Sequence, residues 1–136
     1  MKPIKLLVKT QSETYPIIIG YDLVKDLKKH LKNNFIDFNQ CLLVIDKKVP
    51  KRMIFKITRS LKKKKTYKHF YASSEKNKNQ KCVNKILEIL LKKNFSRKDC
   101  IITVGGGITG DVGGFAASLF KRGLQFINIP TTLLAQ

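Results

Sequence analysis

Tryptophan is absent from this sequence of 136 residues, and cysteine, histidine and methionine are scarce. The three cysteines, Cys41, Cys82 and Cys100, are odd in number and show no C-x-x-C spacing. This excludes a regular disulfide framework, and we interpret the cysteines as small buried thiols in a reducing compartment. The two histidines, His30 and His69, are far apart and have no carboxylate or cysteine partner at ligand spacing, so we expect no metal site within this sequence.

Long apolar runs are also missing. No stretch approaches the roughly 20 residues of a membrane-spanning helix. The N-terminal run "LLV" is too short for a secretory signal. We therefore expect a cytoplasmic protein with no membrane partner. The apolar fraction of 43% is that of a globular chain, and the length corresponds to about one domain.

Acidic residues are few: 9 stand against 28 Lys and Arg, giving a formal net charge of +19. Such a charge favours polyanions as partners. Arginine, the residue best suited to bidentate phosphate and base contacts, is rare among the cations. The densest lysine run, 61–68, contains one aromatic residue, Tyr67, and no stacking pattern. We expect no specific nucleic-acid partner, because an AT-rich genome would place the same lysines on a tolerant surface; a basic polyanion-binding remnant is an alternative.

Strand-like and helix-like segments alternate along the chain. The predicted strands are 3–8, 15–20, 41–46, 66–72, 100–104 and 125–129. The predicted helices are 22–34, 49–62, 79–93 and 110–120. We interpret the first two strands as a hairpin at the edge, 66–72 as a central strand, and Asp22 as a helix N-cap. Repeated strand–helix–strand units predict an α/β fold with a parallel, Rossmann-like sheet and helices on both faces.

A cluster of glycines follows the strand at 100–104. Gly105, Gly107 and Gly110 have the G-x-G-x-x-G spacing of a dinucleotide-binding turn. Glycine lets the backbone approach a pyrophosphate closely, and the amides of a helix N-terminus favour its charge. A nucleotide-binding P-loop is excluded because Asp111 stands where lysine is needed. Asp111 has two open interpretations, a stabiliser of the helix start or a ligand contact.

The spacing alone does not settle what the turn binds. An ordinary Rossmann unit has an acidic residue about 20 residues beyond the glycines, on the ribose. No acidic residue follows Asp111 here, so the acid would come from Asp46 or Glu75. A different nucleotide fold and a plain tight turn therefore both stay open. Phe115 and Phe120, in the helix that follows, are interpreted as core residues.

The longer string "GGGITGDVGGFAASLFKRG", followed by "FINIPTTLLAQ", resembles the 3-dehydroquinate synthase family. That family carries a G-G-G-x-x-G-D turn, a G-F-x-A helix, an R-G pair and P-T-T-L-L-[AS]-Q. Residues 105–136 match this order without a gap. The resemblance weakens upstream yet spans the chain. It implies that residues 1–136 form the N-terminal NAD-binding α/β domain and that a helical C-terminal domain lies beyond them.

The resemblance implies an NAD site made from several segments. Arg122 matches an arginine that reaches substrate phosphate across a dimer interface. Lys48 stands where the family has asparagine, and Ser74 stands where it has glycine. The implied NAD-binding residues are Asp46, Glu75, Lys78, Gly106, Gly107, Ile108, Thr109, Gly110, Asp111, Thr131 and Thr132.

The implied reaction converts 3-deoxy-arabino-heptulosonate 7-phosphate to 3-dehydroquinate and phosphate, a step of the shikimate pathway. Transient oxidation of an alcohol by NAD acidifies the neighbouring C–H, phosphate leaves, and hydride returns. A divalent metal, zinc or cobalt, polarises the alcohol. Its ligands and most catalytic lysines lie in the C-terminal part of the family.

The family string continues beyond L-L-A-Q. We therefore expect this chain to be an N-terminal portion that is inactive alone and belongs to a homodimer when the protein is full length. A related sugar-phosphate cyclase with another substrate is an alternative.

Overall fold

The structure is a computed structural model and describes residues 2–132 and 134–136. Its strands are β1 (Ile4–Lys9), β2 (Thr14–Ile19), β3 (Gln40–Asp46), β4 (Lys65–Tyr71), β5 (Cys100–Gly105) and β6 (Gln125–Pro130). Its α-helices are α1 (Leu27–Asn33), α2 (Lys51–Ser60), α3 (Gln80–Lys92) and α4 (Gly107–Leu119). Three 3-10 helices are η1 (Leu23–Asp26), η2 (Glu75–Asn77) and η3 (Phe120–Arg122).

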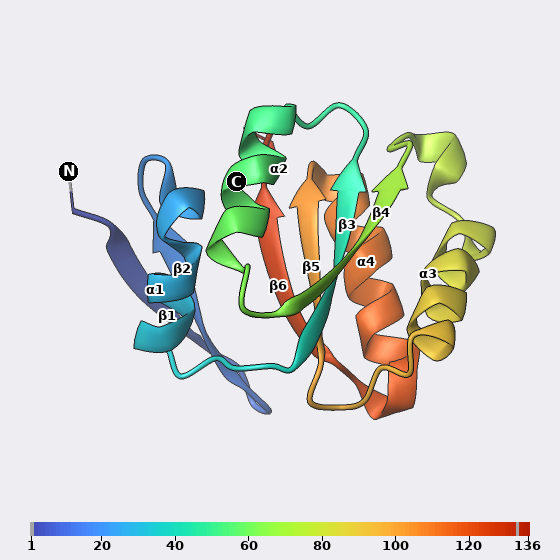
Figure 1. Cartoon of the computed structure of the whole chain (residues 1–136), viewed down its shortest axis with the longest axis horizontal. Helices are drawn as coiled ribbons and strands as arrows, with labels where there is room; N and C mark the ends of the chain where they lie inside the picture. The colour runs from blue at the N-terminus through green and yellow to red at the C-terminus, as the bar shows by residue number, and fades with distance from the viewer. Residues whose placement is uncertain (1, 133) are drawn as a thin grey trace.

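Four strands form one parallel sheet in the order β4-β3-β5-β6. All four arrows point the same way in Figure 1, with α2 on one side of the sheet and α3 and α4 on the other. This confirms the predicted α/β fold with a parallel sheet and helices on both faces. Because parallel strands end at one edge, the segments that follow β3, β5 and β6 are brought close together.

The two central strands, β3 and β5, are buried on both faces. Leu43 and Ile102 pack with α1 and α2, while Leu42 and Ile101 pack with α3 and α4. All four side chains are fully buried, and burying such a side chain stabilises the fold by about 1.5–3 kcal/mol each. Burial on both faces explains why these strands appear in the sequence as unbroken apolar runs.

Two predictions about strands are wrong. β4 lies at an edge of the sheet, not in its centre. It pairs with β3 on one side, and no strand of the described residues pairs with its other side. Its exposed residues, including Lys68 and Phe70, fit an edge position. The N-terminal hairpin is confirmed as a pair, but β1 and β2 form a separate two-stranded antiparallel sheet and do not extend the edge of the main one.

Two predictions about helix starts are also wrong. The segment 22–34 divides into η1 and α1, and Asp22 caps neither of them through its side chain. Asp22 adopts a left-handed φ of 49° and forms an ion pair with Lys56 at 2.8 Å instead. The helix predicted from Gly110 begins three residues earlier, at Gly107. The low helix propensity of glycine masked this start, and packing against the sheet overrides the propensity.

The expected burial of the cysteines is confirmed for two of the three residues. Cys41 and Cys100 are fully buried in adjacent strands, while Cys82 is partly exposed. Burial raises the pKa of the Cys41 and Cys100 thiols, which keeps both protonated and unreactive. Within the described residues, no helix is both long and apolar enough to cross a membrane.

Candidate functional site

The carboxyl ends of β3, β5 and β6 meet at one edge of the sheet, where α4 begins (Figure 1). Gly105 and Pro130 end their strands side by side in register. The backbone N–H of Thr131 donates to the carbonyl of Gly105 at 2.9 Å, which ties the threonine pair to the glycine turn. Asp46 ends β3 at the same edge. Parallel sheets bind ligands in this position.

Gly105 is required by close packing. A Cβ atom here would lie 2.8 Å from Thr109 Oγ1 and 2.9 Å from Asp46 Cβ. Only glycine lets the end of β5 pass between these two side chains. The Asp46 side chain is held in turn, because its Oδ1 accepts a hydrogen bond from the backbone N–H of Lys48 at 3.0 Å. Lys48 therefore orients Asp46 through its main chain.

Gly107 has a different character. It is the first residue of α4, and its φ is not positive. Apart from its chain neighbours and the nearby helix backbone, no atom of the described residues lies within 4 Å of the place where a Cβ would stand. Neither backbone conformation nor packing therefore demands glycine there. At Gly106, the N-cap, a Cβ would lie 3.2 Å from Thr132 Cγ2, and no side chain caps the helix. The first turn of α4 thus presents uncapped N–H groups beside open space, an arrangement that suits an anion.

Thr109 supports the glycine turn from the interior of the protein. Its side chain is fully buried, and Oγ1 has no hydrogen-bond partner among the described residues. It packs under Gly105, so its role toward a ligand is limited to the backbone of the helix turn. Ile108, beside it, is only partly exposed and packs against the α3–α4 side of the core.

Asn128 is a supporting residue that the sequence analysis missed. Its Oδ1 accepts a hydrogen bond from Thr103 Oγ1 at 2.8 Å. The same oxygen would lie 3.2 Å from a Cβ at Gly110, so this glycine lets α4 sit directly on the side chain of β6. No motif marks such a residue, because its value depends on strands that lie far apart in the sequence.

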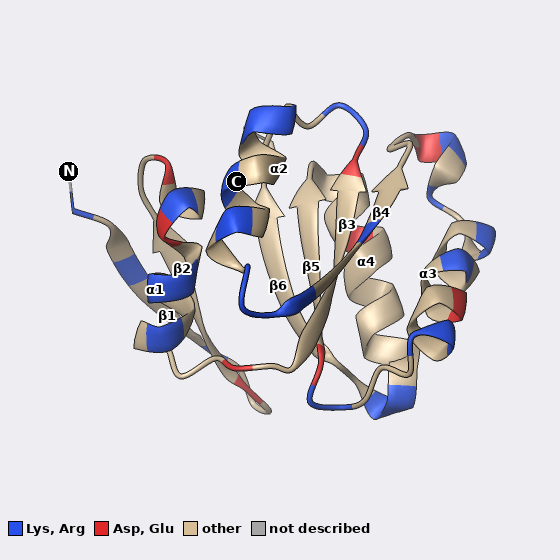
Figure 2. Ribbon diagram, viewed as in Figure 1, with Lys and Arg blue, Asp and Glu red and all other residues tan. Residues whose placement is uncertain are grey.

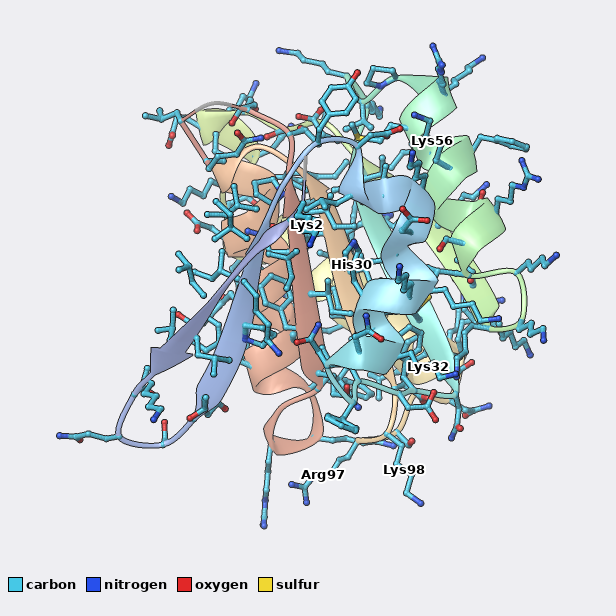
Figure 3. All side chains as sticks on the ribbon, turned by 90° about the vertical axis from the view of Figure 1, so that its left-hand side faces the viewer. Lys2, His30, Lys32, Lys56, Arg97 and Lys98 are labelled. Atoms are coloured by element: carbon cyan, nitrogen blue, oxygen red, sulfur yellow. The ribbon has the colours of Figure 1, made fainter. Side chains whose placement is uncertain are left out.

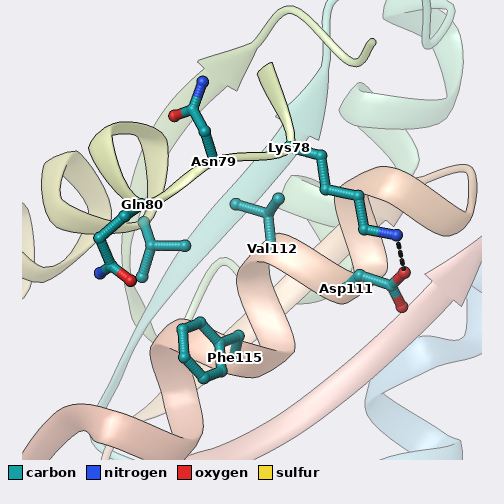
Figure 4. A pocket seen from close by; sticks show the side chains of 7 residues that line it. Lys78, Asn79, Gln80, Asp111, Val112 and Phe115 are labelled. Carbon is teal, nitrogen blue, oxygen red and sulfur yellow. Dashed lines mark ion pairs between the residues drawn. The ribbon is translucent and has the colours of Figure 1, made fainter. Parts of the chain in front are cut away.

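Lys78 and Asp111 form an ion pair across the space between α3 and α4, with Nζ 3.0 Å from Oδ2 (Figure 4). Both side chains are exposed. The hydrogen bond that Lys78 donates to the Asp111 carboxylate raises the pKa of Lys78. The first turn of α4 contains no acidic residue, so Asp111 does not stabilise the helix start. A ligand contact by Asp111 stays a prediction.

A hollow with a volume of about 330 Å³ opens beside this pair (Figure 4). This volume is near the lower end for ligand pockets, which run to about 1,000 Å³. Phe115 lines it and is 48% exposed, so its interpretation as a core residue is wrong; Phe120 is buried, as expected. The lining residues are Lys78, Asn79, Gln80, Val83, Asp111, Val112 and Phe115.

The turn that carries Glu75 and Lys78 is held in place by the end of β4. Ser74 Oγ accepts from the backbone N–H of Asn77 at 3.3 Å, and the Asn77 side chain donates to the carbonyl of Ala72 at 2.8 Å. Below them, the Tyr71 hydroxyl donates to the carbonyl of Asn77. Burial raises the pKa of Tyr71 to about 12. Tyr71 is a second supporting residue that the sequence did not reveal.

We predict that Tyr71→Phe lowers the free energy of unfolding by about 1–2 kcal/mol near neutral pH, because the carbonyl of Asn77 loses its buried donor. The loss should shrink as pH rises from 10 toward 12. In that range Tyr71 ionises in the unfolded wild-type chain but stays protonated in the folded one. The wild type therefore loses stability as pH rises, whereas the variant, which has no hydroxyl at this position, does not. Urea unfolding at neutral and at alkaline pH measures both effects. Tyr21→Phe, at a side chain that is 87% exposed, is the control and should change little.

Arg122 is not brought to the other candidate residues. It ends η3, beyond the far end of α4, shortly before β6 starts at the opposite edge of the sheet. It is exposed and has a left-handed φ of 67°. A contact with substrate phosphate by way of a second subunit therefore stays a prediction. No group of three His, Cys, Asp or Glu side chains that could hold a metal ion exists among residues 2–132 and 134–136.

A family model described as 3-dehydroquinate synthase N-terminal matches residues 68–136. The 3-dehydroquinate synthase of Pelagibacter ubique (strain HTCC1062) is 61% identical over 133 residues, which cover 98% of this chain and 36% of that protein. The 3-dehydroquinate synthase of Alkaliphilus metalliredigens (strain QYMF) is 37% identical, covering 97% of this chain and 36% of its own length. The chain thus spans about a third of the length of these relatives.

Solved structures show a similar fold. A 2-deoxy-scyllo-inosose synthase, complexed with carbaglucose-6-phosphate, NAD+ and Co2+, aligns with a TM-score of 0.86 at 23% identity and covers 97% of this chain and 36% of that one. A 2-epi-5-epi-valiolone synthase from Streptomyces hygroscopicus, with NAD+ and Zn2+ bound, aligns with a TM-score of 0.61 at 26% identity, covering 71% of this chain and 28% of its own.

Proposed function

This chain belongs to the 3-dehydroquinate synthase family, whose N-terminal model matches half of it, and we propose that it forms the NAD-binding domain of such an enzyme. The complete protein would convert 3-deoxy-arabino-heptulosonate 7-phosphate to 3-dehydroquinate and phosphate in the cytoplasm. The observation that supports this proposal best is the uncapped first turn of α4, where Gly107 leaves open space beside Asp46 and the threonine pair.

The residues at this edge suit the parts of a dinucleotide. The free N–H groups of the α4 first turn, from Gly107 to Thr109, would hold the pyrophosphate, whose negative charge the helix N-terminus favours, while the N–H of Gly110 already donates to the carbonyl of Gly106. The Asp46 carboxylate, held by the backbone of Lys48, would accept hydrogen bonds from a ribose. Thr131 and Thr132 would contact the cofactor from the end of β6.

The second group of candidates lies on the other side of the turn. Glu75 would accept hydrogen bonds from the adenosine ribose, presented by the turn that Tyr71 holds. Lys78 would exchange Asp111 for a pyrophosphate oxygen, because both partners are exposed and their ion pair opens at low cost. Asp111 would then be free to accept a hydrogen bond from the ligand.

NAD, when bound, supplies reversible hydride transfer at the alcohol of the substrate. The contribution of this chain is to bind and orient that cofactor. In our proposal the divalent metal, the catalytic lysines and most substrate contacts belong to the longer portion that relatives carry, and this chain alone does not complete the reaction. Arg122 would act in a second subunit of a homodimer.

We predict that this chain binds NAD and that Lys78→Gln weakens the binding by about tenfold, the loss expected for one charge-assisted hydrogen bond. Titration calorimetry with NAD measures the affinity, and thermal unfolding should show no change in stability because the ion pair is exposed. Lys76→Gln removes the same charge from an exposed position of the same turn and should bind NAD normally. Equal affinity of both variants would contradict the assignment of Lys78.

A related sugar-phosphate cyclase is a second candidate, supported by the similarity in fold to the 2-deoxy-scyllo-inosose synthase. The higher sequence identity to 3-dehydroquinate synthases favours the first. Both candidates share the NAD site, so the titration tests them together, and a substrate assay on the complete protein separates them.

A further inference from the structure

A groove with a volume of about 680 Å³ lies between α1 and α2, on the side of the molecule that faces the viewer in Figure 3. It belongs to the helix layer opposite α3 and α4, away from the proposed cofactor site. Figure 2 shows Lys and Arg along both helices. The residues that line the groove are Lys25, Asp26, Lys28, Lys29, Lys32, Phe55, Lys56, Arg59, Ser60, Lys62 and Lys63.

The walls of the groove are fixed to each other. At one place Lys56 Nζ lies 2.8 Å from Asp22 Oδ1, and the adjacent ammonium lowers the pKa of Asp22, so this link stays ionic at neutral pH. At another place the backbone N–H of Lys28 donates to Ser60 Oγ at 2.8 Å. The inner sides of both helices are anchored in the core, through Leu31 of α1 and Ile57 of α2. The groove is therefore a defined surface.

The charge of the groove is strongly one-sided. Eight of the described residues that line it are cationic, against one carboxylate, Asp26. On the first wall, Lys25, Lys28, Lys29 and Lys32 follow the three- and four-residue spacing that places side chains on one face of a helix. Like charges at this spacing destabilise a helix, and a polyanion in the groove would relieve the repulsion between the walls.

An aromatic ring lies among these cations. Phe55 lines the groove from α2 and is 63% exposed. Exposed rings next to a row of cations are the arrangement with which proteins bind single-stranded nucleic acid, because the bases stack on the ring while the phosphates meet the cations. A duplex keeps the faces of its bases covered and cannot use the ring. Phe55 thus distinguishes this groove from a surface that is merely basic.

We propose that the α1–α2 groove binds single-stranded nucleic acid without sequence preference. The phosphates contact the lysines of both walls, and a base stacks on Phe55. This role is independent of the proposed cofactor site and requires no base-specific contacts. It is compatible with the rarity of arginine in the chain, since a lysine serves a phosphate as a point charge.

The first test compares two triple variants of equal net charge. Lys28→Gln/Lys32→Gln/Lys63→Gln removes cations of the groove but leaves the Lys56–Asp22 link intact, while Lys81→Gln/Lys85→Gln/Lys92→Gln removes exposed cations of α3 on the opposite face. Fluorescence anisotropy follows a labelled single-stranded RNA of about 12 nucleotides over a range of salt concentrations. The groove variant should lose about tenfold or more in affinity, and its salt slope should fall by about 2. The α3 variant should lose much less, and equal losses would overturn the proposal.

The second test addresses stacking. Phe55→Ala should weaken binding of the single strand by about tenfold and leave binding of an abasic strand of the same length unchanged. The ring is exposed, so the variant should fold normally, which circular dichroism checks. Wild-type protein should bind the single strand more tightly than the matched duplex. An unaffected Phe55→Ala variant, or a duplex bound equally well, would overturn the assignment to single strands.

Discussion

Gly113→Ala is expected to destabilise the chain by about 3 kcal/mol, the upper part of the usual cost of overpacking a core. Gly113 lies in the middle of α4 where the helix crosses β5. A Cβ added there would stand 2.1 Å from Thr103 Cγ2, far inside van der Waals contact. Thr103 is fully buried and cannot rotate freely, because its hydroxyl donates to Asn128. The helix would have to move off the sheet, which would also displace the turn at its N-terminus.

The neighbouring glycine provides a matched control. At Gly114 a Cβ would lie 3.2 Å from Phe126 Cζ, the far end of a ring that is 40% exposed and can move. Gly114→Ala should be close to neutral, since the gain in helix propensity, up to about 1 kcal/mol, offsets the small displacement. Thr103→Ser removes the obstructing methyl but keeps the hydroxyl, so the double variant Gly113→Ala/Thr103→Ser should recover much of the loss.

Urea unfolding followed by circular dichroism measures the wild type and all four variants, including Thr103→Ser alone, and a double-mutant cycle gives the coupling between positions 103 and 113. A Gly113→Ala variant as stable as Gly114→Ala would show that α4 does not approach β5 as closely as described. Purely additive effects of the two substitutions would show that the loss has another origin than contact with Thr103.

Gly107→Ala is expected to preserve the stability of the fold but to weaken the binding of NAD. The added methyl enters open space at a permitted φ, so the free energy of unfolding should stay unchanged or rise by up to about 1 kcal/mol. Affinity for NAD should nevertheless fall by about tenfold or more, because the methyl occupies the place where a pyrophosphate would approach the first turn of α4. A substitution that stabilises the fold and weakens binding identifies a glycine kept for a ligand.

Calorimetric titration with NAD and urea unfolding of the same samples measure both quantities. Ser118→Ala, an exposed substitution near the other end of α4, also raises helix propensity, by a smaller amount, without touching the turn, and its NAD affinity should equal that of the wild type. Undiminished NAD affinity in Gly107→Ala would mean that the cofactor does not meet this turn.

Much of the fold could be predicted from local pattern. The unbroken apolar runs of β3 and β5 indicated buried parallel strands, and the apolar stripe of α3 located that helix to within one residue at each end. One failure of pattern concerns a strand. β4 was predicted to lie in the centre of the sheet, but it lies at an edge. An edge strand differs from a central one by lacking a strand neighbour on one side, and the local sequence does not show which strands become neighbours.

Part of the candidate site could likewise be predicted from the sequence, and part could not. The order of glycines, Asp111 and the threonine pair in the sequence was sufficient to indicate a dinucleotide site and its family. Tyr71 and Asn128 could not be found from the sequence, because each acts on a partner that the fold brings to it: the turn before α3 for Tyr71, and Thr103 and the first turn of α4 for Asn128.

Sequence alone determined the class of fold, the edge of the sheet where a ligand would bind, and the glycine turn, since each follows from periodicity or from a motif read along the chain. Tertiary structure alone decided what each glycine does. Gly105 and Gly113 lie against atoms from distant segments, whereas Gly107 faces open space. The same residue type therefore serves packing in two places and leaves room for a ligand in the third, and only the surrounding atoms make that distinction. It also decided that lysines scattered between positions 25 and 63 line one groove, because the core draws α1 and α2 together on one face of the sheet.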